Sequence, residues 1–250
     1  MIVSVKNAHT LIEQFTKFNM PRRSKRHKSY VPPVPDMKRI FPKTDAQEEM
    51  MTSIDDNPVT FVDGCAGVGK TLIAVYKAVN LIENGEIDNI LYIKPNVDMT
   101  GERGVGFLKG ELDEKLAPLL DPLKDNIKVF LADHKTKYYE NKEKISVGLL
   151  EYLRGRSLDR TFVIFDEAQN TTPHGVITAI SRLTDNSKIV VMGDVVQCDT
   201  GLHMNGLRDA FLRYKGLPEV GFVQFSEEDV VRNGFMRGIL RRYRQSLPAS

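Results

Sequence analysis

The segment Gly64–Thr71, GCAGVGKT, combines residue types that together can bind phosphate. Its spacing fits the phosphate-loop pattern, with four residues between Gly64 and Gly69, and then Lys and Thr. Glycines let the backbone curl so that several N–H groups point inward, because glycine has no Cβ and tolerates positive φ. A helix that begins at the loop directs its first N–H groups at the phosphate oxygens. The residues of this predicted phosphate loop are Gly64, Cys65, Ala66, Gly67, Val68, Gly69, Lys70 and Thr71.

Two side chains of the loop carry further chemistry. Lys70 supplies a full positive charge for the β- and γ-phosphates of a nucleotide, and Thr71 offers a hydroxyl to Mg²⁺. The alternative is a Gly-rich turn followed by Lys-Thr through coincidence. An apolar run before the loop, residues 59–62, and a helical pattern after it favour the phosphate loop.

A pair of carboxylates follows a second apolar run. Residues 162–165 are Phe-Val-Ile-Phe, and Asp166 and Glu167 come next. In open α/β sheets, ligands bind at the carboxyl ends of the strands. We therefore expect Asp166 to hold Mg²⁺ together with Thr71, and Glu167 to orient or deprotonate an attacking water. The alternative is that two acids after a strand only solvate a loop or cap a helix.

A third apolar run, residues 189–192, leads into Gly-Asp-Val-Val-Gln-Cys-Asp. Asp194 and Gln197 in this segment would reach the same edge of the sheet and could sense the γ-phosphate. An ordinary turn with Gln197 on the surface is the alternative.

The elements that must position these residues alternate along the chain. Apolar strands without polar alternation, separated by helices, predict an α/β fold of three layers with a mainly parallel sheet between helices. The strands are expected at residues 59–62, 90–93, 128–131, 145–147, 162–165, 189–192 and 220–225, and the helices at 45–54, 71–83, 112–123, 175–183, 201–214 and 229–244.

Composition restricts the class of protein. The 250 residues carry a formal net charge of only +2, and the two cysteines, Cys65 and Cys198, have neither zinc-site nor disulfide-framework spacing. We find no signal peptide and no membrane span, so a cytoplasmic setting is expected. The domain organisation is expected to be an N-terminal segment at 1–40 with a basic, Pro-rich arm, an ATPase domain at 41–245 and a tail at 246–250. The arm either binds nucleic-acid phosphates or is a solvated disordered segment.

Several of these segments, in order along the chain, resemble the motifs of the PhoH-like ATPases, which look like a single motor core of superfamily 1 helicases. They are FPKTDAQ at 41–47, the phosphate loop, KPNV at 94–97 leading to GVGFLKG at 104–110, FDEAQN at 165–170, GDVVQCD at 193–199 and DVVR at 229–232. The resemblance covers residues 41 to about 240. Lys94, Lys109, Asn233 and Phe165 depart from the residues usual in that family.

The resemblance implies a P-loop NTPase (RecA-like) fold and further roles. Gln47 would contact the adenine base, and Arg232 would reach the γ-phosphate as an arginine finger in cis or in trans. ATP, Mg²⁺ and a ring-like homo-oligomer such as a hexamer are implied as well. We therefore expect a Mg²⁺-dependent ATPase that acts on RNA or single-stranded DNA. A nucleotide-gated binding module with slow turnover and a P-loop kinase remain as alternatives.

Overall fold

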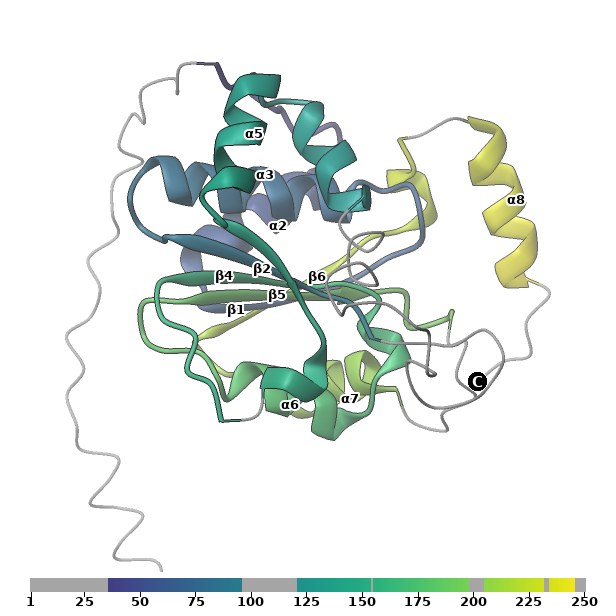
Figure 1. Cartoon of the computed structure of the whole chain (residues 1–250). Helices are drawn as coiled ribbons and strands as arrows, with labels where there is room; N and C mark the ends of the chain where they lie inside the picture. The colour runs from purple at the N-terminus through teal and green to yellow at the C-terminus, as the bar shows by residue number, and fades with distance from the viewer. Residues whose placement is uncertain (1–35, 96–120, 154, 198–204, 232–233, 246–250) are drawn as a thin grey trace, which may run out of the picture. The chain divides into compact units, whose positions relative to one another are not determined.

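In the computed structural model of the chain, which describes residues 36–95, 121–153, 155–197, 205–231 and 234–245, six strands form one parallel sheet. The strand order is β3-β2-β4-β5-β1-β6 (Figure 1). The strands are β1 (Val59–Asp63), β2 (Asn89–Ile93), β3 (Ile145–Gly148), β4 (Thr161–Phe165), β5 (Lys188–Gly193) and β6 (Val220–Gln224).

The central strands are apolar along their whole length because both faces of the sheet are covered. All five residues of β4 are buried. Strand β5 lies between β1 and β4, with Ile189 opposite Val59 on one side and Val163 on the other. The three strands run in the same direction, so the segments that follow them emerge at one edge of the sheet.

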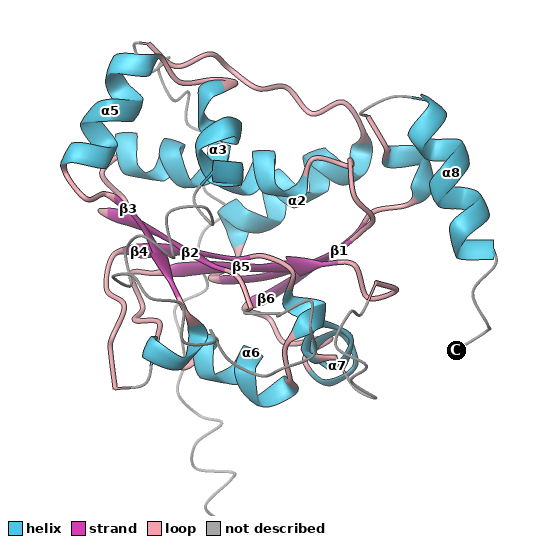
Figure 2. Cartoon of the chain, turned by 45° about the vertical axis from the view of Figure 1, so that its right-hand side comes forward, coloured by secondary structure: helices cyan, strands magenta, loops and turns pink. Residues whose placement is uncertain are grey.

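Helices cover the two faces of the sheet. Helices α2 (Asp45–Asp56), α3 (Lys70–Glu83) and α5 (Asp133–Asn141) lie on one face, and α6 (Pro173–Ile180) and α7 (Gly206–Arg213) lie on the other (Figure 2). Side chains from alternate positions of the strands pack into two separate apolar clusters, one for each face. The predicted three-layer α/β P-loop fold is thus confirmed.

Short 3₁₀ helices and a last α-helix complete the described part of the chain. They are η1 (Leu150–Leu153), η2 (Ala168–Asn170), η3 (Glu227–Asp229) and α8 (Gly234–Gln245). Arg237 of α8 donates to the carbonyl oxygen of Val230 at 3.1 Å and pairs with Glu228 at 3.4 Å. The helix expected at 229–244 therefore starts later: Asp229 ends a 3₁₀ turn, and α8 begins at Gly234.

Local chemistry accounts for several of the helix starts. The Thr44 hydroxyl accepts from the N–H of Gln47 at 3.3 Å, which confirms it as the N-cap of α2. Asn205 caps α7 in the same way by accepting from the N–H of Arg208 at 2.6 Å, so this helix begins at Gly206 rather than at residue 201. Residues 201–204 are not among those described.

The strand expected at 128–131 is wrong, because residues 121–128 are helical and Leu131 makes only an isolated bridge with Met37. The buried side chains Leu123, Ile127 and Phe130 follow the three-to-four-residue spacing of a helix. A short apolar run was thus part of a helix face. Helix α5 was not predicted, because it has few apolar residues and buries only Thr136 and Tyr139.

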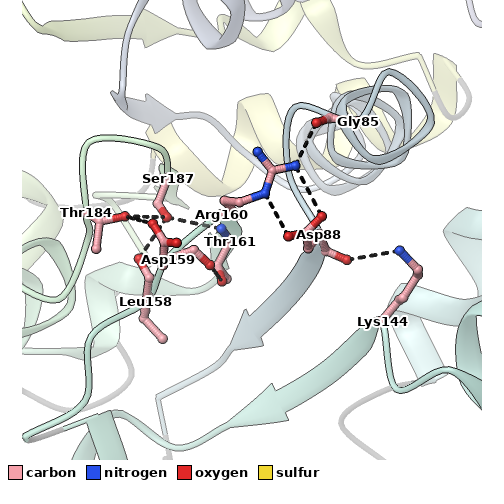
Figure 3. Close-up of polar contacts among 9 residues, drawn as sticks. All are labelled: Gly85, Asp88, Lys144, Leu158, Asp159, Arg160, Thr161, Thr184 and Ser187. Carbon is pink, nitrogen blue, oxygen red and sulfur yellow. Dashed lines mark hydrogen bonds and ion pairs between the residues drawn. The ribbon is translucent and has the colours of Figure 1, made fainter.

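The amino-terminal ends of the strands are held by a polar network (Figure 3). Arg160 has a left-handed backbone with φ 44°. Its Nε donates to Asp88 at 2.7 Å and its Nη2 to the carbonyl oxygen of Gly85 at 2.7 Å. The N–H of Asp88 donates in return to the carbonyl oxygen of Arg160 at 2.7 Å. These contacts join the starts of β2 and β4 at the edge opposite to the phosphate loop.

Some predictions concern residues outside the described ranges. They are the N-terminal segment and its basic arm, the segment 96–120, Arg232 and the tail. The expected domain boundaries therefore remain predictions. Among the described residues, no helix has the length and apolar character needed to cross a membrane.

Candidate functional site

The phosphate loop joins the end of β1 to the start of α3, and its glycines serve two different physical needs. Gly67 has φ 89° and Gly69 has φ 91°, which is left-handed backbone that favours glycine. Gly64 is required for space instead, because a Cβ there would lie 2.6 Å from the Cβ of Phe225 on the segment after β6. Cys65 and Val68 are fully buried and attach the loop to the apolar core.

Lys70 and Thr71 open α3 and face different partners. The Lys70 ammonium donates to the carbonyl oxygen of Cys65 at 3.0 Å and also to that of Gly64. The Thr71 hydroxyl donates to Oδ2 of Asp166 at 3.2 Å. A residue of the loop and a residue after β4, 95 positions apart in sequence, are therefore in direct contact, as the sequence predicted.

Asp166 is a buried carboxylate whose two oxygens both accept hydrogen bonds. Oδ2 also accepts from the Tyr92 hydroxyl at 2.9 Å, and Oδ1 accepts from the N–H of Glu167 at 3.0 Å. Burial raises the pKa of Asp166, and the Glu167 carboxylate raises it further, whereas the Tyr92 hydrogen bond and the Lys70 charge act in the opposite direction. Burial also raises the pKa of the Tyr92 phenol, which keeps it a donor.

Glu167 follows in a left-handed backbone conformation, with φ 55° and ψ 35°. Its carboxylate accepts from Nε2 of Gln169 at 2.7 Å. Left-handed backbone is uncommon for residues other than glycine and is enriched at functional sites.

The segment after β5 comes to the same edge. The N–H of Val195 donates to Oδ1 of Asp63 at 3.0 Å, and the N–H of Val196 donates to Oδ1 of Asp194 at 3.0 Å. Asp194 is buried, and Gln197 is bonded through its N–H to the carbonyl oxygen of Asp194 at 3.0 Å. The turn is therefore tied both to itself and to the end of β1.

These segments enclose a cavity of about 370 Å³. It is lined by Ala66, Gly67, Gly69, Lys70, Thr71, Leu72, Asn126, Asp166, Glu167, Gly193, Asp194, Gln197 and Val231. The structure thus brings together both predicted acids, both predicted sensor residues and the exposed half of the loop. The predicted residues Gln47, Gly64, Cys65 and Val68 do not line it, and three of these four are part of the loop itself.

Gln47 lies against the outside of the loop and is buried. Its Nε2 donates to the carbonyl oxygen of Val68 at 2.8 Å, and its Oε1 accepts from the N–H of Lys43 at 2.8 Å. A Cβ on Gly69 would lie 3.0 Å from Nε2 of Gln47. The side chain expected to contact a base therefore braces the phosphate loop.

Arg232 lies outside the described residues, but its neighbour in the chain can be placed. The N–H of Val231 donates to the carbonyl oxygen of Gly67 at 3.2 Å, and Val231 lines the cavity. The DVVR segment thus passes directly over the phosphate loop.

Sequence reasoning missed two of the residues that shape the site. Tyr92 stands in the apolar run of β2, where an aromatic residue reads as core. Gln169 was part of a quoted motif but received no role. The signal for both is a polar tip within a buried segment, which only a neighbouring strand can reveal.

Comparison with known proteins agrees with the motif order. The PhoH family, described as PhoH-like protein, matches residues 39–244. A PhoH-like protein of Bacillus subtilis (strain 168) is 39% identical over 208 residues, covering 82% of this chain and 64% of the relative. The corresponding values are 38% over 205 residues, 82% and 62% for a PhoH-like protein of Synechocystis sp.. Protein PhoH of Escherichia coli (strain K12) is 32% identical over 211 residues, covering 83% and 59%.

The chain spans about three fifths of the length of the curated relatives it matches. Among solved structures, the large terminase of a thermophilic bacteriophage aligns with a TM-score of 0.49 at 13% identity, over 84% of this chain and 51% of that chain, which is too distant to support any argument about activity. The family match and the relatives above 30% identity extend over most of the 250 residues. The chain therefore belongs to the PhoH family of PhoH-like proteins.

Proposed function

We propose that the chain binds ATP with Mg²⁺ at this cavity and hydrolyses it, and that hydrolysis is coupled to RNA or single-stranded DNA. The observation that carries the proposal is the contact of Thr71 with Asp166, because it joins a phosphate loop to an acidic strand end in one cavity. Nucleotide-binding chemistry and a buried pair of carboxylates are then within reach of the same ligand.

The residues present fit a triphosphate and its metal ion. The left-handed glycines and the start of α3 aim backbone N–H groups into the cavity, which suits anionic oxygens. The Thr71 hydroxyl and the Asp166 carboxylate are the oxygen donors that Mg²⁺ prefers, directly or through water. When bound, Mg²⁺ bridges the phosphates and neutralises charge that develops during phosphoryl transfer. Among the described residues, no cluster of three or more His, Cys, Asp and Glu forms a metal site without a nucleotide.

Each side chain then has a defined task. Lys70 exchanges its carbonyl partners for the more strongly accepting phosphate oxygens. Glu167 orients the attacking water and accepts its proton. Asp194 and Gln197, on the opposite wall, sense the γ-phosphate. Arg232 follows Val231 in the chain and would stabilise the transition state in cis or from a neighbouring copy in a ring, such as a hexamer.

Two substitutions test hydrolysis. Lys70→Ala should abolish both binding of a fluorescent ATP analogue and release of phosphate, whereas Glu167→Gln should retain binding and lose turnover by on the order of 100-fold or more. Lys77→Ala on the same helix, where Lys77 pairs with Asp55, is the matched control. A Glu167→Gln variant with the wild-type rate would exclude the assigned role of this carboxylate.

Coupling to nucleic acid has its own test. RNA or single-stranded DNA should raise the rate of ATP hydrolysis at low salt, and the effect should fade as salt increases, since phosphate contacts release counterions. Equal rates with and without polymer at low salt would favour the nucleotide-gated binding module instead. Transfer of phosphate to an added acceptor rather than to water would favour the kinase.

A further inference from the structure

We infer that Gln169 is a positioning residue that holds the Glu167 carboxylate and ties it to the segment after β5. This inference rests on the proposed function, because it assigns to Gln169 the control of a group that acts on water. Gln169 lies in η2, immediately after the acidic pair, and its side chain is 1% exposed.

The contacts of Gln169 define which end of its amide faces which partner. Nε2 donates to Oε2 of Glu167 at 2.7 Å, and Oε1 accepts from the N–H of Asp194 at 3.2 Å. An ionised carboxylate can only accept and a backbone N–H can only donate, so the amide has one satisfactory orientation. A single buried side chain therefore connects the ends of β4 and β5.

Gly193 provides the space that this side chain needs. A Cβ at Gly193 would lie 2.1 Å from Oε1 of Gln169 and 3.1 Å from Leu207. The backbone of Gly193 is that of an ordinary strand residue, so glycine is required here by close approach and not by φ. The sequence thus combines a glycine on β5 with a glutamine after β4, and each accounts for the other.

The conformation of Glu167 explains why a tether is needed. Its left-handed backbone persists only where the surroundings determine it, and its N–H is already bonded to Asp166 at 3.0 Å. The Gln169 amide fixes the other end of the residue, the carboxylate. Without it, the carboxylate is free to rotate away from the water it must orient, although the nucleotide contacts of the loop remain.

The same amide makes the two walls of the cavity move together. Asp194 and Gln197 belong to one hydrogen-bonded turn, and Gln169 bonds to the first N–H of that turn. A displacement of the turn on contact with a γ-phosphate therefore shifts Gln169, and with it Glu167. Sensing and water activation become coupled through one hydrogen-bonded chain.

Variants at both ends test the inference. Gln169→Glu preserves shape but replaces the donor to Glu167 by an acceptor, and Gln169→Met removes both hydrogen bonds. Gly193→Ala pushes the amide from the opposite side. Each should lower kcat on the order of tenfold or more, while the affinity for a fluorescent ADP analogue stays within about twofold, as expected for a loss confined to the chemical step.

Matched controls and a double-mutant cycle complete the design. Gly148→Ala changes the last residue of β3, where a Cβ meets only the flexible tip of Leu91 at 3.1 Å, and Gln224→Glu makes the same chemical change at the exposed end of β6. Both should keep the wild-type kcat. In a Glu167→Gln background, Gln169→Met should produce no further loss, because its effect passes through the missing carboxylate.

Three results would overturn the inference: wild-type kcat in Gln169→Met, additive losses in the cycle, or parallel loss of nucleotide affinity and kcat, which indicates a general structural role. Failure of the proposed function is separate and is recognised by full activity of Glu167→Gln. A melting temperature is recorded for every variant so that unfolding is distinguished from a loss of turnover.

Discussion

Replacing Gln47 by leucine separates two roles for this residue. The family resemblance implies that Gln47 contacts adenine, whereas in the structure its amide is bonded to the carbonyl oxygen of Val68 and the N–H of Lys43. Leucine is similar in size and as favourable in a helix, so Gln47→Leu removes the two hydrogen bonds and leaves α2 intact.

The structure gives the size of the effect. Each lost hydrogen bond costs about 0.5–1.5 kcal/mol of unfolding free energy, so the pair costs about 1–3 kcal/mol. In a domain of this size, 1 kcal/mol corresponds to about 2–4 °C in Tm, which predicts a decrease of about 2–12 °C. Loss of the Val68 contact alone loosens the loop by about 0.5–1.5 kcal/mol, and this weakens nucleotide binding roughly two- to tenfold.

The assay compares fluorescent ATP and GTP analogues, together with calorimetric unfolding. A residue that braces the loop affects both nucleotides by the same factor, because both present the same phosphates. Thr52→Leu, at an exposed position of α2, controls for the added leucine and should change neither measurement. An unchanged Tm together with weaker binding of ATP only would refute the bracing role and assign Gln47 to the base.

Two further predictions concern carboxylates with a lowered pKa. Burial acts to raise the pKa of Asp229, but hydrogen bonds from Ser226 and Thr44 outweigh it and lower the pKa. The stabilisation from this carboxylate is therefore present above the unfolded value of 3.8 and is lost as pH falls through the lower folded value; Asp229→Asn should lower Tm at pH 7, with the difference from wild type vanishing in acid, as measured by thermal unfolding across pH. The guanidinium of Arg160 likewise lowers the pKa of Asp88, so Arg160→Ala should lower Tm at pH 7 with unchanged kcat, and the deficit should shrink in high salt and below the pKa of Asp88. A pH-independent deficit in either variant would contradict the assigned ion.

The sequence was sufficient for those parts of the site that are local. A strand, a glycine-rich turn and a helix start are contiguous at residues 59–83, so their geometry follows from the pattern. The two acids could be placed at the same edge because β4 runs parallel to β1. Apolar periodicity likewise predicted the buried strands, and it failed at 128–131 because three or four apolar residues do not distinguish a strand from one face of a helix.

The parts that were missed depend on which strands are neighbours. The contact of Gln169 with Asp194 exists only because β5 lies beside β4, and the hydroxyl of Tyr92 reaches Asp166 only because β2 lies on the other side of β4. Strand order is a long-range property that no local pattern contains. Helix α5 was missed for a related reason, since it is attached by polar contacts of Lys135 and Tyr139 to Glu83 on α3.

The polar groups of the cavity are bonded to one another, and this bears on how a nucleotide would bind. Lys70 is bonded to loop carbonyls, Thr71 to Asp166, and Gln169 to Glu167. Binding of a triphosphate is then largely an exchange of partners, in which charged phosphate oxygens replace neutral carbonyls as acceptors for Lys70. Because these groups are already oriented and partly removed from water, less reorganisation is needed when charge develops on the phosphates, which is the condition under which fixed dipoles stabilise a transition state most effectively. Substitutions that leave one partner of such a pair unbonded should therefore impair turnover more than those that remove both.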